Sequence, residues 1–277
     1  MTSRRSLHLV QSTRKSAMSP PMAHSHGHQG GPPGSPQIDT RERGAPKDGE
    51  PQYLQTRLFM QLLVFQVPTG TSISANQEAL LAALREADVP AVVYADANDP
   101  RGVALLTFSE DPALFVDTVR PLFEAEPMRD WTLRPELTMI GRTYSSGYEQ
   151  DLAFWLLDRP RQTVLNEDWN WAVWYPLRRT GAFEQLEPRE KGGILREHAT
   201  ISRAYGEQDL AHDVRLACHG LDTNDNEFLI GLIGAELHPL SHVVQSMRGT
   251  VQTSQYIQQM GPFFVGRAIG RNAGSKK

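Results

Sequence analysis

The order of predicted elements repeats along this sequence, and the repeat restricts the fold more than any other feature. Apolar segments of strand length alternate with segments whose apolar residues recur at helical spacing. The first half reads strand, helix, strand, strand, helix, strand. Its six predicted elements cover residues 58–67, 75–89, 91–97, 102–110, 111–126 and 130–141. Asp111 is a good N-cap for the second helix, with Pro112 at the first helical position.

The second half shows the same order over a similar length. After a linker at residues 141–166, its six elements cover residues 170–179, 188–205, 213–220, 226–234, 239–249 and 262–269. One β-α-β-β-α-β series forms a ferredoxin-like unit. The sequence therefore predicts an α+β fold made of two tandem ferredoxin-like units with two antiparallel sheets.

The chain divides into three predicted segments, which are a tail at 1–52 and domains at 53–150 and 151–277. The tail is rich in Pro, Gly and Ser and nearly free of aromatic residues. Such a segment cannot bury enough apolar area to offset the entropy of ordering, so we expect it to be disordered. It contains His24, His26 and His28, which could bind a transition metal, although a solvated tail or the remnant of an expression tag is the simpler explanation.

Charge and hydropathy exclude several classes of function. The formal charge is −4, and residues 1–50 hold 7 Lys/Arg against 4 Asp/Glu, so the remainder carries −7. An acidic body argues against binding to nucleic acid, which requires concentrated positive charge. The longest apolar runs are strand-sized, well short of the roughly 20 residues of a membrane span. The N-terminus lacks the apolar core of a secretory signal, and the single Cys218 fits a reducing compartment, so we expect a cytoplasmic protein.

His198 is unusual because it lies on the apolar stripe of the predicted helix at 188–205. A helix docks on a sheet through such a stripe, so an imidazole is expected at the interface. A core histidine with backbone hydrogen bonds would explain this, and so would a haem ligand presented from a helix. The stripe consists of Ile194, Leu195, His198, Ile201 and Tyr205.

Tyr175 and Arg215 are unusual for their predicted strands. Tyr175 closes the aromatic part of one strand, directly before Pro176, and Arg215 interrupts an apolar strand. A packing aromatic ring and an arginine on the wet face of a sheet are the structural explanations. A phenol, an imidazole and a guanidinium on one sheet-and-helix layer would also make a haem pocket.

Several short motifs in the second half strengthen the haem interpretation. They are YPLRR at 175–179, REH at 196–198, DTNDNEF at 222–228, SMRG at 246–249 and GPFFVG at 261–266. Together they resemble the chlorite dismutase superfamily, and within it the coproheme decarboxylases, which are peroxide-dependent haem synthases. The resemblance spans residues 55–268. It implies a fold of the dimeric α+β barrel type, haem bound by the C-terminal unit only, and a homopentamer.

The resemblance also implies an activity and roles for individual residues. His198 matches the proximal iron ligand, and Tyr175 matches the tyrosine whose radical attacks a propionate. Hydrogen peroxide would then convert coproheme III to protohaem b by oxidative decarboxylation of two propionates. A basic or hydroxyl side chain holds each propionate in the family, and the matching positions here are Arg179, Arg248 and Thr253.

The distal position, on the open side of the iron, is assigned by counting back from the NDNEF motif. This count gives Arg215, but the segment after His198 is longer than in the family, so Ala211 or His212 could occupy that place. The position is Gln in many decarboxylases and Arg in chlorite dismutases. A chlorite dismutase, another peroxidase-like haem enzyme and a haem-binding module without catalysis therefore remain the alternatives.

Overall fold

The computed structural model describes residues 37–275. Most of the predicted tail, including His24, His26 and His28, lies outside the described residues. The chain is divided between Asp39 and Thr40, and the following account concerns the compact unit that begins at Thr40. The predicted tail is not disordered to its end at residue 52, because β1 (Glu42–Arg43) pairs with β2 (Tyr53–Leu54), which directly follows the tail, in a small antiparallel sheet.

The first repeat forms four principal strands with two helical segments. The strands lie in the order β7-β3-β5-β4, in which the first and third strands are central, as in a ferredoxin-like unit. Its elements are β3 (Phe59–Gln66), α1 (Ile73–Glu86), β4 (Ala91–Asp96), β5 (Gly102–Ser109), η1 (Phe115–Val119), α2 (Arg120–Leu122), η2 (Met128–Asp130), β6 (Thr132–Leu133), η3 (Pro135–Leu137) and β7 (Met139–Arg142).

The second repeat has the matching strand order β12-β8-β10-β9. Five short elements of this half are absent from the sequence prediction. The predicted linker contains the helical segments η4 and α3, α4 follows the first strand, and η5 and β11 precede the last strand. The elements are η4 (Phe154–Asp158), α3 (Arg159–Leu165), β8 (Trp171–Arg179), α4 (Gly181–Glu184), α5 (Pro188–Glu207), β9 (His212–Ala217), β10 (Phe228–Gly234), α6 (Leu237–Met247), η5 (Gln252–Tyr256), β11 (Ile257–Met260) and β12 (Phe264–Asn272).

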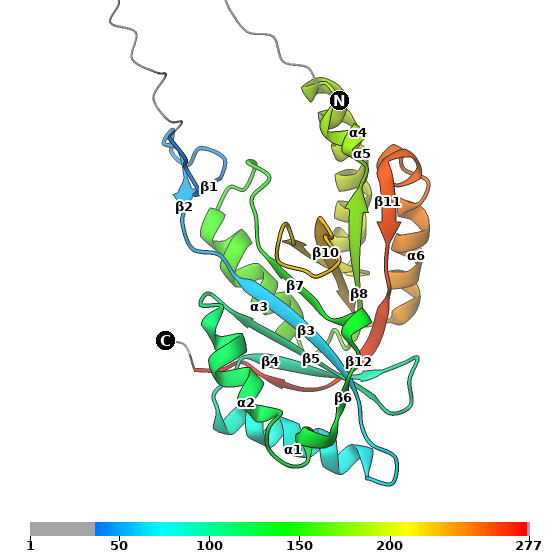
Figure 1. Ribbon diagram of the computed structural model, residues 1–277. Helices are drawn as coiled ribbons and strands as arrows, with labels where there is room; N and C mark the ends of the chain where they lie inside the picture. The colour runs from blue at the N-terminus through cyan, green and yellow to red at the C-terminus, as the bar shows by residue number, and fades with distance from the viewer. Residues whose placement is uncertain (1–36, 276–277) are drawn as a thin grey trace, which may run out of the picture. The chain divides into compact units, whose positions relative to one another are not determined.

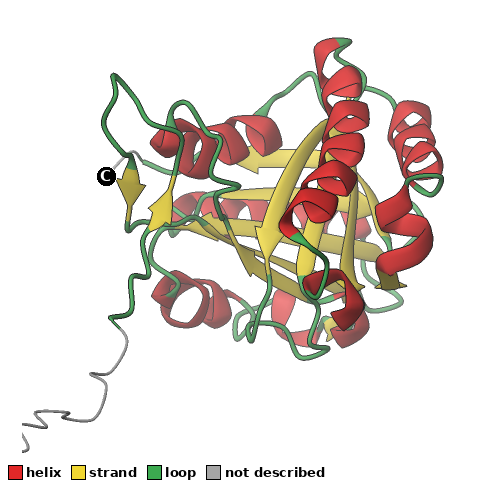
Figure 2. Cartoon of the chain, turned by 90° about the horizontal axis from the view of Figure 1, so that it is seen from above, coloured by secondary structure: helices red, strands yellow, loops and turns green. Residues whose placement is uncertain are grey.

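The two predicted sheets are joined into one closed antiparallel sheet (Figure 1). At one junction β4 and β12 share six residue pairs, and at the other β7 and β9 share the single pair Arg142–Ala217. Figure 2 shows this unit from above, with the strands in the middle and the helices on the outside. The α+β fold class is therefore confirmed, with the correction that the sheets are continuous.

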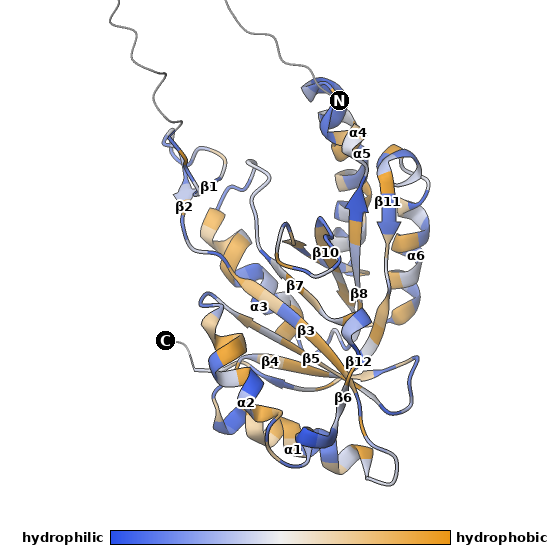
Figure 3. Ribbon diagram, in the orientation of Figure 1, coloured by the Kyte–Doolittle hydropathy of each residue, from blue (hydrophilic) through white to orange (hydrophobic). Residues whose placement is uncertain are grey.

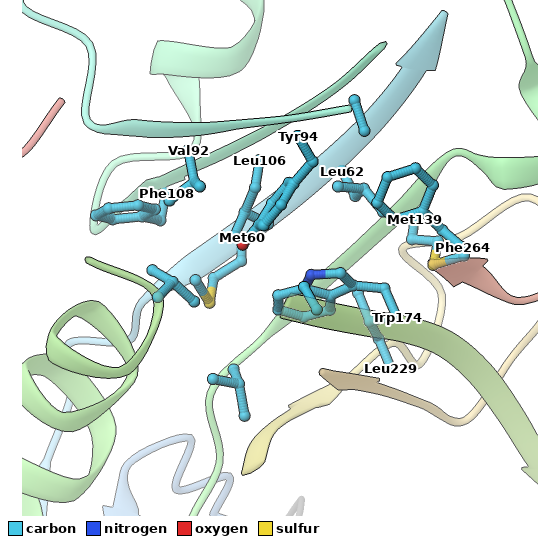
Figure 4. Packing of buried hydrophobic residues seen from close by; sticks show 14 of the residues in the cluster. Met60, Leu62, Val92, Tyr94, Leu106, Phe108, Met139, Trp174, Leu229 and Phe264 are labelled. Carbon is cyan, nitrogen blue, oxygen red and sulfur yellow. The ribbon is translucent and has the colours of Figure 1, made fainter. Parts of the chain in front are cut away.

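Three apolar clusters hold this arrangement together. The interior of the closed sheet is filled by large side chains such as Tyr94, Trp174 and Phe264, which come from β4, β8 and β12 (Figure 4). Outside the first repeat, α1 packs Leu80 and Leu84 against the sheet. Outside the second repeat, α5 and α6 cover the other face of β8 and β10. Because both faces of most strands are covered, the strands are largely apolar (Figure 3).

Among residues 37–275, no helix combines the length and apolar character needed to cross a bilayer.

Candidate functional site

Tyr175, Ile230 and Arg215 form one row across three neighbouring strands. Tyr175 of β8 pairs with Ile230 of β10, and Ile230 in turn pairs with Arg215 of β9. Directly paired residues of antiparallel strands project from the same face. Two strand spacings separate the backbones of Tyr175 and Arg215, which is about 10 Å. The sheet therefore brings two of the unusual side chains to one face, on the side that α5 and α6 cover.

Tyr175 is buried in the cluster beneath α5 and α6. Its ring stacks on Phe263 with 4.6 Å between the ring centroids. Burial raises the pKa of the Tyr175 phenol, Asp213 raises it further, and Arg248 acts in the opposite direction. The phenol is thus neutral at physiological pH. It is held in place by packing, and its hydroxyl makes no hydrogen bond to the protein within the described part of the chain.

His198 lies on α5, and its Nδ1 atom is buried without a hydrogen-bond partner among the described residues. Burial lowers the pKa of His198, and Arg215 lowers it further, against the opposing effects of Asp213 and Glu197. The imidazole is therefore neutral at pH 7. An unpaired buried nitrogen is costly, so this atom is available for a partner other than the residues that the structure describes.

Helix α5 packs loosely for its length. It has 20 residues, and Ile194 is the only one of them that is buried. Leu195, predicted to lie on the buried stripe, is instead 41% exposed, because the helix touches the sheet along a narrower line than the stripe. Ile201 and Tyr205 are partly buried against the sheet cluster, as the stripe predicts.

Asp213 is the site residue that the sequence reasoning missed. Asp213 precedes Arg215 by two residues on β9 and lies in the adjacent cross-strand row. In that row, Leu232 of β10 pairs with Asp213 on one side and with Val173 of β8 on the other. Arg215 Nε lies 2.9 Å from Asp213 Oδ2, and Arg159 of α3 donates to Asp213 Oδ1 at 2.8 Å. Burial alone would raise the pKa of Asp213, but Arg215 and Arg159 lower it below its ordinary value. Strand alternation places Asp213 on the Arg215 face, and that signal was present in the sequence.

The structure separates the three residues considered for the distal position. His212 precedes Asp213 on β9, so its side chain leaves the opposite face of the strand. There its ring stacks on Trp169 at 3.5 Å and binds Asp209 at 2.7 Å. Ala211 precedes β9 and offers only a methyl group. Arg215 alone of the three places a polar side chain in the row of Tyr175.

The three predicted propionate-binding residues differ in whether their side chains already have partners within the protein. Arg179 is paired with Glu227, and its guanidinium lies over the rings of Phe183 and Phe228. Thr253 Oγ1 accepts a hydrogen bond from Thr250 at 3.2 Å. Arg248, the C-cap of α6, is exposed and makes no side-chain hydrogen bond or ion pair within residues 37–275. Arg248 is therefore the cation of this group that is free to bind an anion.

The family model described as chlorite dismutase matches residues 123–269, which include every predicted site residue. This chain belongs to the chlorite dismutase family. The predicted superfamily is thereby confirmed. A comparison with curated proteins finds no match.

Solved structures of chlorite dismutase-like proteins share the fold. A haem-binding protein from Thermus thermophilus is 15% identical, with a TM-score of 0.62 over 79% of this chain and 94% of that one. A chlorite dismutase from Candidatus Nitrospira defluvii, in complex with imidazole, is 11% identical, with a TM-score of 0.61 over 78% of this chain and 93% of that one. Identities this low establish the shared fold alone.

Proposed function

We propose that this protein is a coproheme decarboxylase, which uses hydrogen peroxide to convert iron-coproporphyrin III to protohaem b. The observation that carries the proposal is the row of Tyr175 and Arg215 on the sheet face beneath the helix of His198. An oxidisable phenol on this face is what a decarboxylase requires and what simple haem binding does not.

The residues present fit a haem group. His198 offers a neutral imidazole with an unpaired buried nitrogen, which is the protonation state that iron binds. The loosely packed α5, in which only Ile194 is buried, could move away from the sheet to admit a planar ligand onto the buried face that holds Tyr175. His198 would hold the iron from the helix side, leaving the sheet-side groups to meet the oxidant and the propionates.

Three side chains would hold the propionates. Arg248 has no competing partner among the described residues, and Thr253 offers a hydroxyl from the neighbouring turn. Arg179 would bind a propionate only after giving up part of its pairing with Glu227. Guanidinium groups suit this task because they can bind a carboxylate bidentately.

The bound haem with peroxide would supply the oxidising power. Each propionate carboxylate would lose CO₂, two electrons and one proton to leave a vinyl group, while one hydrogen peroxide takes up those electrons, that proton and one more from solvent to form two waters. Tyr175 would give up its phenolic proton and one electron beside the reacting propionate. Packing against Phe263 fixes the ring for this step, because no protein hydrogen bond positions the hydroxyl in the part of the chain that the structure describes. Arg215 would stabilise negative charge on the open side.

Chlorite degradation is the second candidate, and Arg215 is the observation that favours it. A cation in this row suits an anionic oxidant, and its pKa is raised mainly by Asp213, so it stays charged. Tyr175 favours the decarboxylase instead, since chlorite turnover needs no tyrosyl radical.

The deciding experiment mixes purified protein with iron-coproporphyrin III, adds peroxide, and follows product masses. We expect two successive losses of the elements of formic acid, as CO₂ and two hydrogens. Tyr175→Phe should keep coproheme binding and stop the decarboxylation. Tyr205→Phe is the matched control, because it removes a hydroxyl bound to Ser246 at 2.9 Å on the same helix-and-sheet layer. Rapid O₂ release from chlorite with intact coproheme would establish the second candidate instead.

We further propose that the chain assembles as a homopentamer, as the family resemblance implies. The first repeat contributes none of the proposed site residues, so support of the second repeat and of subunit contacts is its proposed role. Light scattering at micromolar concentration should give a mass near five chains, and a stable monomer would contradict this.

A further inference from the structure

The Asp213 carboxylate is shared between two guanidinium groups. Arg159 takes Oδ1 at 2.8 Å and also donates to the Asp213 main-chain carbonyl at 2.9 Å. Arg215 takes Oδ2 through its Nε at 2.9 Å. Arg159 comes from α3, outside the strand that carries the other two residues, so it fixes the carboxylate from a second element. Both oxygens of Asp213 are therefore committed, and the carboxylate is held on two sides.

This arrangement determines how Arg215 is presented. Its Nε lies 2.9 Å from Asp213 Oδ2 in an ion pair, while its two terminal nitrogens have no hydrogen-bond partner in the described part of the protein. The side chain is 47% exposed, so these terminal groups can meet a ligand. The terminal nitrogens of Arg215 can thus still donate hydrogen bonds to a ligand, while the carboxylate of Asp213 balances the positive charge of Arg215 by direct contact. A balanced cation attracts anions less than a free one, but it donates hydrogen bonds to neutral molecules equally well.

We propose that Asp213, anchored by Arg159, is a positioning and specificity-determining residue that holds Arg215 and makes the haem site prefer neutral oxidants, such as hydrogen peroxide, over anionic ones, such as chlorite. This inference rests on the proposed function, because it assigns the open side of the bound haem to Arg215. It also explains how an arginine can occupy this row in a decarboxylase.

The first test measures ligand affinity of the haem-loaded full-length protein by absorbance titration. Azide and fluoride report on anions, and imidazole reports on a neutral ligand. Asp213→Asn should tighten azide and fluoride binding by about tenfold, since a charge several ångströms away is removed in a partly shielded site. Imidazole affinity should change less than twofold. In Asp213→Asn combined with Arg215→Gln, the gain for anions should disappear.

Asp209→Asn is the matched control. It removes the same charge four residues earlier, where Asp209 binds His212 and is 73% exposed. It should leave anion affinity unchanged. Equal tightening in both variants would mean that net charge, rather than the Asp213–Arg215 contact, sets the affinity, and would overturn the inference. Haem binding with no change in anion affinity in the Asp213→Asn variant would overturn it as well.

A second test does not depend on haem or on the folding of the Asn variant. The Asp213 side-chain carboxyl resonance of the wild-type apoprotein should shift in Arg215→Gln, because the guanidinium that lies 2.9 Å from Oδ2 is removed. An unshifted resonance would show that Asp213 does not hold Arg215. A protein that binds no haem at all would overturn the proposed function and the selectivity together, whereas haem binding without selectivity would overturn the inference alone.

Discussion

Arg179 donates from its Nε to both carboxylate oxygens of Glu227, each at 3.0 Å. The main-chain N–H of Arg179 donates to the same carboxylate at 3.1 Å, and the Arg179 side chain is only 11% exposed. The Glu227 carboxylate is thus bound to Arg179, which is the cation that the family resemblance assigns to a propionate of the ligand. Any ligand carboxylate at Arg179 must compete with it.

The first prediction follows from this competition. Glu227→Gln should release Arg179 and tighten binding of iron-coproporphyrin III by roughly tenfold, since a charged competitor becomes a neutral one. Quenching of tryptophan fluorescence measures the affinity. Glu184→Gln is the control, because Glu184 also contacts Arg179, at 3.3 Å, but is 57% exposed and should contribute little. Unchanged affinity in Glu227→Gln would place the propionates elsewhere.

The second prediction concerns iron binding. His198→Ala should weaken haem retention and abolish the iron–histidine stretch in the resonance Raman spectrum, because His198 carries the unpaired buried nitrogen. His242→Ala, which changes an exposed histidine of α6 bound to Tyr205, should retain the stretch. The same stretch in the His198 variant would identify another ligand.

The third prediction concerns α5. A helix with one buried residue is weakly anchored, so its amides should exchange readily in the apoprotein. Haem should slow exchange across residues 188–207 by roughly tenfold or more, as measured by hydrogen–deuterium exchange with mass spectrometry. Helix α1, which belongs to the first repeat and buries Leu80, Leu81 and Leu84, should be unaffected. Equal protection of both helices would indicate general stabilisation instead of a site at α5.

The fourth prediction tests the core. Gly231 pairs with Trp174 across β10 and β8, and a Cβ added there would lie 2.5 Å from the indole ring. Gly231→Ala should lower the free energy of unfolding by about 1–3 kcal/mol, the usual cost of overpacking. Gly193→Ala on α5 meets nothing within 4 Å and should raise it by about 0.5–1 kcal/mol through helix propensity. Urea unfolding of both variants measures the difference, and similar stabilities would contradict the packing.

The fifth prediction concerns acid stability. Burial alone would raise the pKa of Glu149, but hydrogen bonds from Ser145 and Ser146 lower it below its ordinary value of 4.5. A depressed carboxyl pKa contributes stability above the unfolded-state value, and this contribution is lost as the pH falls through the folded-state value. Glu149→Gln should therefore destabilise the protein at pH 7, by about 1–3 kcal/mol for the lost charged hydrogen bonds, and the deficit should shrink below pH of about 4.5.

Thermal melting between pH 7 and pH 3.5 would show this convergence. Glu78→Gln, at an exposed position of α1, should follow the wild type throughout. A constant gap between wild type and Glu149→Gln would mean that the carboxylate charge is not the stabilising feature.

The sequence was sufficient for the fold because both repeats follow apolar periodicity, which depends on neighbouring residues only. It could not show that β4 meets β12 and β7 meets β9, since pairing between distant edges leaves no local pattern. The helical segment at 154–165 was missed because Pro160 and three charged residues obscure its apolar stripe.

The candidate site was predictable to a similar extent. Local patterns and the family motifs pointed to Tyr175, His198 and Arg215 as candidates. The register of β8, β10 and β9, which the sequence does not reveal, places Tyr175 and Arg215 on one face. The role of Asp213 depends on Arg159, which lay in a segment assigned to a linker, so the shared carboxylate could not be inferred. The pairing of Arg179 with Glu227 was hidden for a related reason, because their 48-residue separation is bridged only when β8 and β10 pair.

The unequal junctions of the closed sheet have a mechanical consequence. Six residue pairs join β4 to β12, whereas the single pair Arg142–Ala217 joins β7 to β9. A pulling force across the closed sheet would separate β7 from β9 first, and the β4–β12 junction would act as the hinge. The strands within each repeat would stay paired while the closed sheet opens. The gap would open along β9, the strand that carries Asp213 and Arg215, so tension on this protein should disturb the proposed oxidant side before it disturbs the fold.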